Sequence, residues 1–362
     1  LVGSMFYAYF TPMVFVVGMV GNSLSLCVFL SKNMRHLSAS TYLAALSFSD
    51  IINLIFYVLY EWLTRGLRVI TSGSHVSFLH IDGACHVIMY LHYVSRFLSA
   101  WLVVAFTIER YIGVCHPLRR KHICTLSSTK RIVAGLLVLA LLVNIFKPLL
   151  TVSHHVDMWG QACTTNPKYK QLSFILDSIY AVSITFVPFV IISVLNISII
   201  RTLFLHNRQQ RLIRTLMEKS AIKLEFTIIL LIVSFCFVAL NLPYFATWCK
   251  VFLSSNFVKL VSLQDLDEII YFRGVTFIAR AIFYINYCIN FFLYSITGAY
   301  FRRELKRLFV PHAHDYHTCE SPQDKKRFST NSHNFRLLPS KTSDIGDSLK
   351  KISPPSTHDT WV

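Results

Sequence analysis

Long apolar runs alternate with short polar connections along this 362-residue chain. Seven of the runs are long enough to cross a membrane as helices, because a bilayer core of ~30 Å needs about 20 apolar residues. They extend over Met5 to Leu30, Thr41 to Leu63, Cys85 to Cys115, Ile132 to Val152, Leu172 to Ile200, Leu224 to Leu253 and Ile269 to Thr297. We therefore predict an all-α membrane protein built as a seven-transmembrane helix bundle.

The pattern changes after the seventh run. Apolar Phe301, Leu305, Leu308 and Phe309 are spaced by three and four residues against a basic face. This spacing predicts an amphipathic helix over 298–309 that lies on the anionic inner leaflet of the membrane. The membrane domain then covers 1–309, and the Ser-, Thr-, Lys- and Pro-rich tail 310–362 is expected to be disordered.

Composition and charge agree with a membrane protein. Hydrophobic residues make up 54% of the chain and charged residues only 15%, and the net charge is +17. The basic residues concentrate in alternate connections, on the side of Arg110, whereas the opposite side has fewer bases diluted by acidic residues. This asymmetry predicts a cytoplasmic C-terminus and an extracellular N-terminus, so no nucleic-acid role is needed to explain the charge.

The third run has one end at Cys85 and the other at the triplet Glu109-Arg110-Tyr111. The 25 steps from Cys85 to Arg110 span roughly 37 Å as a helix, enough to cross a bilayer. One face of this helix carries a continuous stripe at steps of four and three, formed by His92, Arg96, Ser99, Val103, Phe106 and Arg110.

Arg96 is the unusual member of this stripe. An arginine at the bilayer centre costs roughly 2.5–3.5 kcal/mol on insertion scales, so it must face the bundle interior or a wet cavity and find an anionic partner. Two accounts remain open at this point. Arg96 either pairs with an acidic residue on a neighbouring helix or contacts a ligand.

Several motifs resemble those of rhodopsin-like G-protein-coupled receptors. Glu109-Arg110-Tyr111 closes the third helix, Asp50 lies in the second, Pro243 in the sixth, and the seventh carries Asn290 and Tyr294 in a variant of Asn-Pro-x-x-Tyr. Phe291 replaces the proline of that motif, and Asn241 replaces the usual tryptophan of the sixth helix. This combination looks like invertebrate neuropeptide receptors of the FMRFamide, myosuppressin or CNMamide kind.

The resemblance implies a plasma-membrane receptor that activates heterotrimeric G proteins and recruits arrestin once its tail is phosphorylated. It implies an outward movement of the sixth helix about Pro243. The residues expected to carry this switch are Glu109, Arg110, Tyr111, Phe237, Pro243, Asn290 and Tyr294.

A disulfide is expected on the extracellular side. The family has a disulfide cysteine at the outer end of the third helix, which is Cys85 here, and Cys163 lies in the outer connection after the fourth run. Both face an oxidising compartment, so we predict that they pair. The remaining seven cysteines include Cys319 in the tail, whose palmitoylation the sequence leaves open.

Sodium is the one ion that the resemblance suggests. In the family, an aspartate of the second helix holds sodium together with a serine of the third and asparagines of the seventh. The matching residues are Asp50, Ser99, Asn286 and Asn290. Hard oxygen ligands suit a small hard cation. A water-filled polar network without specific ion affinity is the alternative.

The residue types expected in the pocket restrict the class of ligand that it can bind. Amine receptors carry an aspartate where His92 stands, and opsins carry a lysine where Tyr284 stands. The expected cavity is lined by Glu61, His92, Arg96, Asp177, Tyr244, Trp248, Arg280 and Tyr284. Mixed charge with aromatic rings suits a peptide. A non-peptide small molecule remains the alternative.

We predict that Arg96 and Arg280 receive an acidic or carbonyl-rich group of the ligand, while Glu61 and Asp177 are available to its basic end. The competing account is internal pairing of Arg96 or Arg280 with Glu61, which would make these residues structural.

Other classes of protein lack support. A transporter should show internal repeats and paired interrupted helices, and an enzyme needs a catalytic constellation. We find neither, and therefore predict no enzymatic activity. Adjacent His154 and His155 would point apart on either a helix or a strand, so we expect a solvated loop there. At the C-terminus, Thr360-Trp361-Val362 could add a strand to a PDZ domain.

Overall fold

The computed structural model describes residues 2–71, 82–156, 160–210, 218–256 and 266–309. The chain divides into a unit Leu1–Val310 and a second unit Pro311–Val362. The predicted disordered tail 310–362 lies outside the described residues, as does its PDZ-type ending. All helices and strands of the described residues belong to the first unit.

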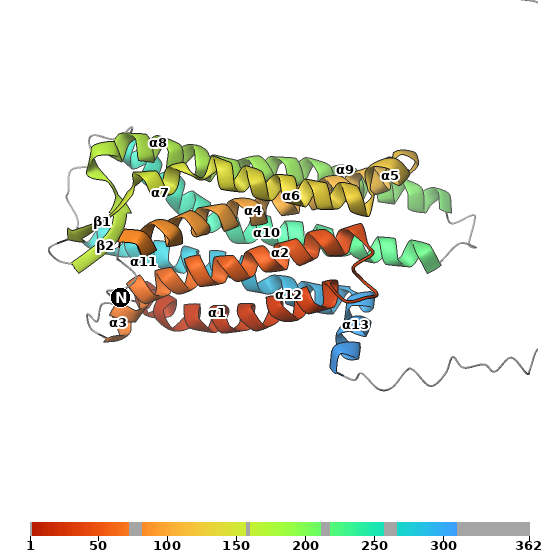
Figure 1. Cartoon of the computed structure of the whole chain (residues 1–362), viewed down its shortest axis with the longest axis horizontal. Helices are drawn as coiled ribbons and strands as arrows, with labels where there is room; N and C mark the ends of the chain where they lie inside the picture. The colour runs from red at the N-terminus through yellow and green to blue at the C-terminus, as the bar shows by residue number, and fades with distance from the viewer. Residues whose placement is uncertain (1, 72–81, 157–159, 211–217, 257–265, 310–362) are drawn as a thin grey trace, which may run out of the picture. The chain divides into compact units, whose positions relative to one another are not determined.

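Seven helical segments of the described chain are long and apolar enough to cross a membrane, as predicted (Figure 1). The first is α1 (Val2–Phe29), and the second joins α2 (Ser38–Asn53) to α3 (Leu67–Thr71). The third is α4 (Asp82–Cys115) and the fourth is α6 (Leu126–Val143) with α7 (Phe146–Leu150). The fifth joins α8 (Lys170–Ala181) to α9 (Val187–Gln210), the sixth is α10 (Glu218–Asn256), and the seventh is α11 (Leu266–Tyr284) with α12 (Asn286–Thr297).

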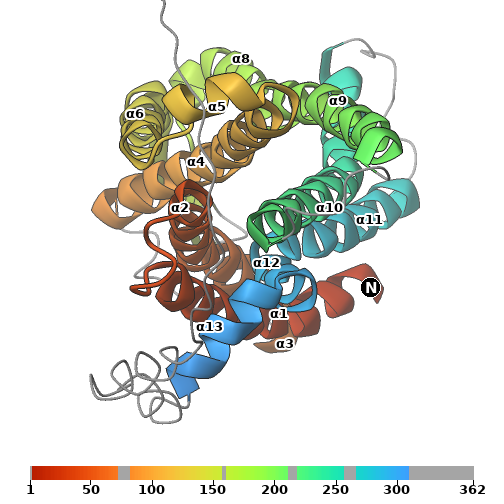
Figure 2. The ribbon, with the colours of Figure 1, turned by 90° about the vertical axis from the view of Figure 1, so that its right-hand side faces the viewer.

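The helix α4 occupies the middle of the bundle. Seen end-on in Figure 2, it runs between α2, α6 and α9, and residues of all three pack against it. Its buried Phe106 meets Tyr42 of α2, with ring centroids 5.9 Å apart. This central position explains why the stripe from His92 to Arg110 has a polar inner face that never meets lipid.

At the outer end, α1 lies close against α11. A Cβ atom at Gly3 would clash with the backbone of Gly274, so this approach requires glycine. Beside it, a second hydrophobic cluster gathers Tyr7, Tyr57 and Tyr284. The outer half of the bundle is therefore rich in tyrosine rings, which supply both apolar faces and hydroxyl groups.

The second helix is wound loosely in its outer half. Two π-helical segments, Leu54–Leu59 and Trp62–Gly66, separate α2 from α3. A third such segment, Val182–Phe186, joins α8 to α9 just before Pro188. Such π-bulges often occur at functional sites, because each one rotates the residues that follow it relative to a regular helix.

The fourth helix breaks between α6 and α7. Pro148 cannot donate to the Asn144 carbonyl one turn earlier, and the backbone N–H of Lys147 donates to it instead at 3.1 Å. The side chain of Asn144 caps the Ala140 carbonyl at 2.7 Å, and the Tyr90 hydroxyl donates to that of Leu141 at 2.8 Å. The side chain of Lys147 is 9% exposed after this break.

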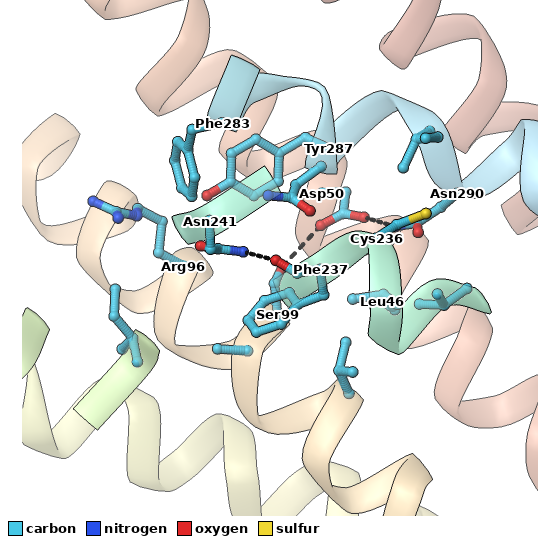
Figure 3. Close-up of a pocket in the computed structure, with 16 residues that line it drawn as sticks. Leu46, Asp50, Arg96, Ser99, Cys236, Phe237, Asn241, Phe283, Tyr287 and Asn290 are labelled. Atoms are coloured by element: carbon cyan, nitrogen blue, oxygen red, sulfur yellow. Dashed lines mark hydrogen bonds between the residues drawn. The ribbon is translucent and has the colours of Figure 1, made fainter. Parts of the chain in front are cut away.

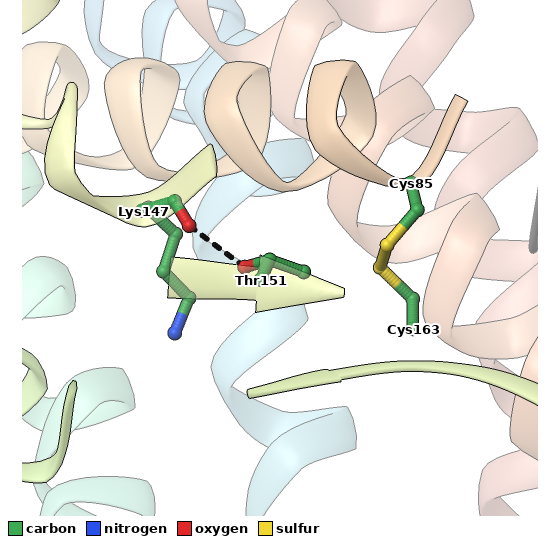
Figure 4. Close-up of a disulfide and its surroundings, with 4 residues drawn as sticks. All are labelled: Cys85, Lys147, Thr151 and Cys163. Carbon is green, nitrogen blue, oxygen red and sulfur yellow. Dashed lines mark hydrogen bonds between the residues drawn. A yellow bond between two sulfur atoms is a disulfide. The ribbon is translucent and has the colours of Figure 1, made fainter. Parts of the chain in front are cut away.

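The connection after α7 is a β-hairpin rather than the solvated loop expected around His154 and His155. Strand β1 (Thr151–Val156) pairs antiparallel with β2 (Gly160–Thr165). The predicted disulfide is confirmed, since Cys163 of β2 is bonded to Cys85 near the start of α4 (Figure 4). The hairpin is thereby tied across the outer end of the bundle.

The predicted amphipathic helix is α13 (Ala299–Phe309), which begins directly after Gly298. Its Phe301 is buried against Phe29 and Tyr294, with ring centroids 5.3 Å and 5.7 Å away. Glu304 accepts a hydrogen bond from Asn33 at 2.9 Å. The helix is therefore anchored both to the seventh span and to the first inner connection.

Candidate functional site

An acidic residue and two arginines form an ion-pair group at the outer end of the second span. Glu61 accepts from the Nε of Arg65 at 2.7 Å and also pairs with Arg280 of α11. The Arg65 side chain is 50% exposed, whereas those of Arg280 and Glu61 are only 12% and 11% exposed. For Arg280, the structure therefore shows the internal pairing with Glu61 that the sequence left open.

Arg96 lies deeper and is surrounded differently. Its guanidinium carbon is 4.9 Å from the ring centroid of Tyr57 and 5.0 Å from that of Phe283. His92 stacks on Tyr57 at 4.0 Å, and its Nε2 lies 3.5 Å from an Arg96 nitrogen. Within the described ranges, no carboxylate comes within ion-pairing distance of Arg96.

Tyr244 and Tyr284 complete this outer aromatic site. The ring of Tyr244 stacks on Phe283 at 5.2 Å, and the Arg280 guanidinium lies 5.6 Å from the Tyr244 ring. Tyr284 is fully buried and meets Tyr57 edge-on at 5.1 Å. The structure thus brings together six of the eight predicted pocket residues, which are Glu61, His92, Arg96, Tyr244, Arg280 and Tyr284.

Asp177 is held elsewhere, which corrects the expectation that it is available to a ligand. Both of its carboxylate oxygens lie within 3.0 Å of the Lys147 ammonium. Tyr93 donates to it at 2.9 Å and Ser173 at 3.2 Å. Lys147 reaches Asp177 because the helix breaks at Asn144, and the pair is therefore structural.

Trp248 also lies apart from the predicted pocket. It stacks on Phe245 at 5.7 Å and lines an apolar groove between the fifth span and α10. The other lining residues there include Ile179 and Val182, both well exposed on the outside of the bundle. Trp248 therefore belongs to the lipid-facing side and does not join the residues around Arg96.

The residues expected to hold sodium do come together. Asp50 accepts from the Ser99 hydroxyl at 2.9 Å and from the Asn290 amide at 2.8 Å. These three residues and Asn286 line one cavity, which Arg96 also lines (Figure 3). The donor set of a carboxylate, a hydroxyl and two amides fits a hard cation.

Of the two expected switch residues on the sixth helix, Phe237 lines the same cavity, whereas Pro243 is not among its lining residues. Phe237 and Asn241 line it, and the Asn241 side chain donates to the Phe237 carbonyl at 2.6 Å. Pro243 lies inside the continuous helix α10, two residues further toward the outer end. Phe237 therefore connects the cavity to the helix that contains Pro243.

At the inner end of α4, Arg110 is paired with its own neighbour. Its Nη2 lies 3.0 Å from Glu109, whose carboxylate also accepts from Ser38 at 2.6 Å and from Thr129 at 3.0 Å. The resemblance implies an acidic partner for Arg110 at the inner end of the sixth helix, but Lys223 stands at that position in the sequence. Its side chain lies outside the described residues, so a missing lock on Arg110 stays a prediction. Burial raises the pKa of the nearby Cys124 thiol, whose S–H points at the Glu109 carbonyl at 3.8 Å.

Two further expected switch residues, Tyr111 and Tyr294, lie toward the inner ends of the third and seventh spans. Tyr111 is half-buried, with its ring 5.4 Å from that of His116. Tyr294 is fully buried, and its ring centroid lies 5.2 Å from that of Phe29. The inner ends of the third and seventh spans are thus both held in place by neighbouring side chains.

Sequence reasoning missed two residues that organise the site. Tyr57 follows Asp50 and Asn53 and precedes Glu61 at helical spacing, so a stripe on the second helix could have revealed it. Lys147 is a lysine inside an apolar run, a signal equal to that of Arg96. Its inward direction depends on the break before Pro148, which the sequence pattern does not place.

The described residues form a seven-helix membrane bundle with a disulfide-tied hairpin and a polar inner stripe, an arrangement that fits the class of seven-transmembrane receptors. The family model described as 7 transmembrane receptor (rhodopsin family) matches residues 21–294. This is most of the chain, so the chain belongs to that family. Its members are receptors and not enzymes.

Individual relatives match more locally. The chain is 32% identical over 117 residues to the thyrotropin-releasing hormone receptor of Gallus gallus, covering 32% of this chain and 28% of that protein. It is 28% identical over 133 residues to the neuromedin-U receptor 1 of Rattus norvegicus, covering 37% and 30%. The match thus spans less than a third of either receptor. A longer match, 25% identical over 311 residues, is to the cysteinyl leukotriene receptor 2 of Mus musculus and covers 84% and 91%.

Proposed function

We propose that this protein is a plasma-membrane receptor that transmits the binding of an extracellular peptide to a heterotrimeric G protein. The excess of basic residues in alternate connections supports an extracellular N-terminus and a cytoplasmic C-terminus. In this orientation the tyrosine-rich site around Arg96 and Arg280 faces outward, and the Glu109-Arg110 pair faces the cytoplasm.

The surroundings of Arg96 indicate which chemical group the ligand presents to this site. Glu61 is already paired with two arginines, and Asp177 is already paired with Lys147. The Arg96 guanidinium contacts the rings of Tyr57 and Phe283, His92 and the Tyr287 hydroxyl, and none of these contacts is a carboxylate. A ligand group that completes this site is therefore acidic or rich in carbonyl oxygens, and matches the guanidinium fork.

The same observation revises the expected binding mode. With both acidic residues engaged inside the protein, no free carboxylate is left in the described pocket for a basic end of the ligand. Arg280 contributes through its position beside Tyr244 while it keeps Glu61. Arg96 is then the primary anchor, and Arg280 a secondary one.

A peptide suits this site because the aromatic rings can pack against one of its side chains while the buried Arg96 binds its carbonyl-rich terminus. Similarity to two relatives, the receptors for thyrotropin-releasing hormone and neuromedin U, supports the proposal that this protein is a receptor for a signalling molecule. A small non-peptide acid is the second candidate, favoured by the long match to a cysteinyl leukotriene receptor. Both candidates use the chemistry of Arg96, so the experiment has to separate them.

The residues below the ligand site indicate how ligand binding is transmitted to the Arg110 end of the bundle. Asn241 and Phe237 of α10 border the cavity under Arg96, and Pro243 lies just beyond them. A ligand that changes the packing at this level favours an outward swing of the inner half of α10 about Pro243. That movement opens the Arg110 end to the C-terminal helix of a G protein.

Two further partners are proposed for the tail. Its serines and threonines, once phosphorylated, would attract arrestin through clustered negative charge. Thr360-Trp361-Val362 would bind a PDZ domain by adding a strand to its sheet edge.

The test is a screen of a neuropeptide library and, separately, a library of small organic acids against cells expressing the chain, with calcium and cAMP as readouts. We expect a peptide agonist, and we expect Arg96→Gln to raise its half-maximal concentration roughly 10- to 100-fold, as for loss of a charge-assisted hydrogen bond. Arg110→Ala should abolish the response at normal surface expression. Activation by acids and not by peptides would establish the second candidate, and an unchanged response of Arg96→Gln would refute the anion site.

A further inference from the structure

The cavity below the ligand site contains both a carboxylate and a fixed positive charge. Asp50, Ser99, Asn286, Asn290 and Arg96 all line it, and Figure 3 shows Arg96 at the opposite end of the site from Asn290. About 40 Å³ of it is open to the centres of water molecules. Since one water needs ~10–15 Å³ of such space, the cavity holds a few waters or a partly hydrated ion, but no larger group.

The carboxylate side is suited to a small cation. Asp50 is 2% exposed and receives only neutral donors, Ser99 and Asn290. The side-chain nitrogen of Asn286 is buried and has no hydrogen-bond partner, so this amide is free to present its oxygen to the cavity instead. In the described structure the negative charge of Asp50 is therefore hydrogen-bonded but not neutralised by a direct ion pair.

Arg96 opposes a cation in the same space. It precedes Ser99 by three residues, and both face the cavity from α4. Tyr57 and Phe283 pack against the guanidinium, and no carboxylate of the described residues lies within ion-pairing distance of it. Like charges that share a small cavity inside a helix bundle repel each other more strongly than they would in water.

We propose that Arg96 is the residue that sets the sodium affinity of this cavity, and that its charge keeps this affinity low. A receptor of this kind responds weakly to sodium until the charge at Arg96 is removed.

The test uses purified full-length receptor and needs no ligand. The midpoint of thermal unfolding is measured against sodium chloride, with choline chloride replacing it at constant ionic strength, for the wild type, Arg96→Gln and Arg96→Lys. We expect the half-maximal sodium concentration to fall on the order of tenfold in Arg96→Gln. It should stay near the wild-type value in Arg96→Lys, which keeps the charge. Asp50→Asn should remove the sodium-specific shift in both the wild-type and the Arg96→Gln background.

Two results would overturn the proposal. One is an equal sodium dependence of the wild type and Arg96→Gln, including the case in which neither shows any. The other is a sodium effect that persists in Asp50→Asn, which would place the ion elsewhere. Arg96→Met is a second neutral variant that serves if Arg96→Gln does not fold. Because no ligand is used, this outcome is independent of the ligand screen.

Discussion

Glu61 is held by two arginines of unequal exposure, and this predicts an order of stability among three single variants. Glu61→Gln removes the only carboxylate that Arg280 pairs with in the described structure. Because the Arg280 side chain is only 12% exposed, its charge is left without a partner in a poorly hydrated place. Breaking a buried pair in this way costs about 3–5 kcal/mol.

Removing either arginine is expected to cost less. Arg280→Gln leaves Glu61 with Arg65 at 2.7 Å, so the carboxylate keeps one cation. We expect a loss of about 1–3 kcal/mol, in the range of one hydrogen bond to a charged group. Arg65→Gln removes a side chain that is 50% exposed, and solvent screening limits its cost to about 0–1 kcal/mol.

The assay is the thermal unfolding midpoint of the three purified variants in one detergent. The expected order of destabilisation is Glu61→Gln, then Arg280→Gln, then Arg65→Gln. The double variant Glu61→Gln/Arg280→Gln should be more stable than Glu61→Gln alone, because no charge is stranded. An Arg65→Gln variant as unstable as Glu61→Gln, or an unchanged Glu61→Gln, would refute the reasoning.

Three further predictions concern other parts of the bundle. Asp177→Asn should lower the unfolding midpoint more than Lys147→Met, since the stranded lysine would be 9% exposed and the stranded carboxylate 29%; the reverse order would contradict the proposed asymmetry. Cys85→Ser opens a crosslink between residues 78 apart and should cost about 2–5 kcal/mol, visible as lower surface expression; expression equal to wild type would argue against a stabilising role. Thr129→Val removes one donor to Glu109 and should raise ligand-independent signalling at matched expression; unchanged basal signalling would show that this hydroxyl does not restrain the switch.

The sequence was sufficient for the features that periodicity and charge determine. The seven spans follow from the length of the apolar runs, because the bilayer requires long apolar helices. The inward stripe of α4 follows from helical spacing, and Cys85–Cys163 from the resemblance and the oxidising compartment. The structure places Ser99 and Asp50 in contact, as this reasoning expected.

The sequence did not reveal which charged side chains pair with each other. Asp177 and Lys147 lie 30 residues apart, and Lys147 follows the break of the fourth helix at Asn144. Hydrophobic periodicity assumes regular helices, so it cannot register the rotation that such breaks introduce. Trp248 was misplaced for a similar reason, since the face that it presents depends on how α10 turns relative to the fifth span.

The most direct test of the central claim is nucleotide exchange by purified components. The receptor is reconstituted in lipid nanodiscs with representatives of each heterotrimeric G-protein class, and the agonist from the screen is added. We predict that the agonist accelerates exchange on at least one class, that Arg96→Gln shifts this response to higher agonist concentration, and that Arg110→Ala abolishes it. An agonist that binds the reconstituted receptor without accelerating exchange on any class would contradict the account.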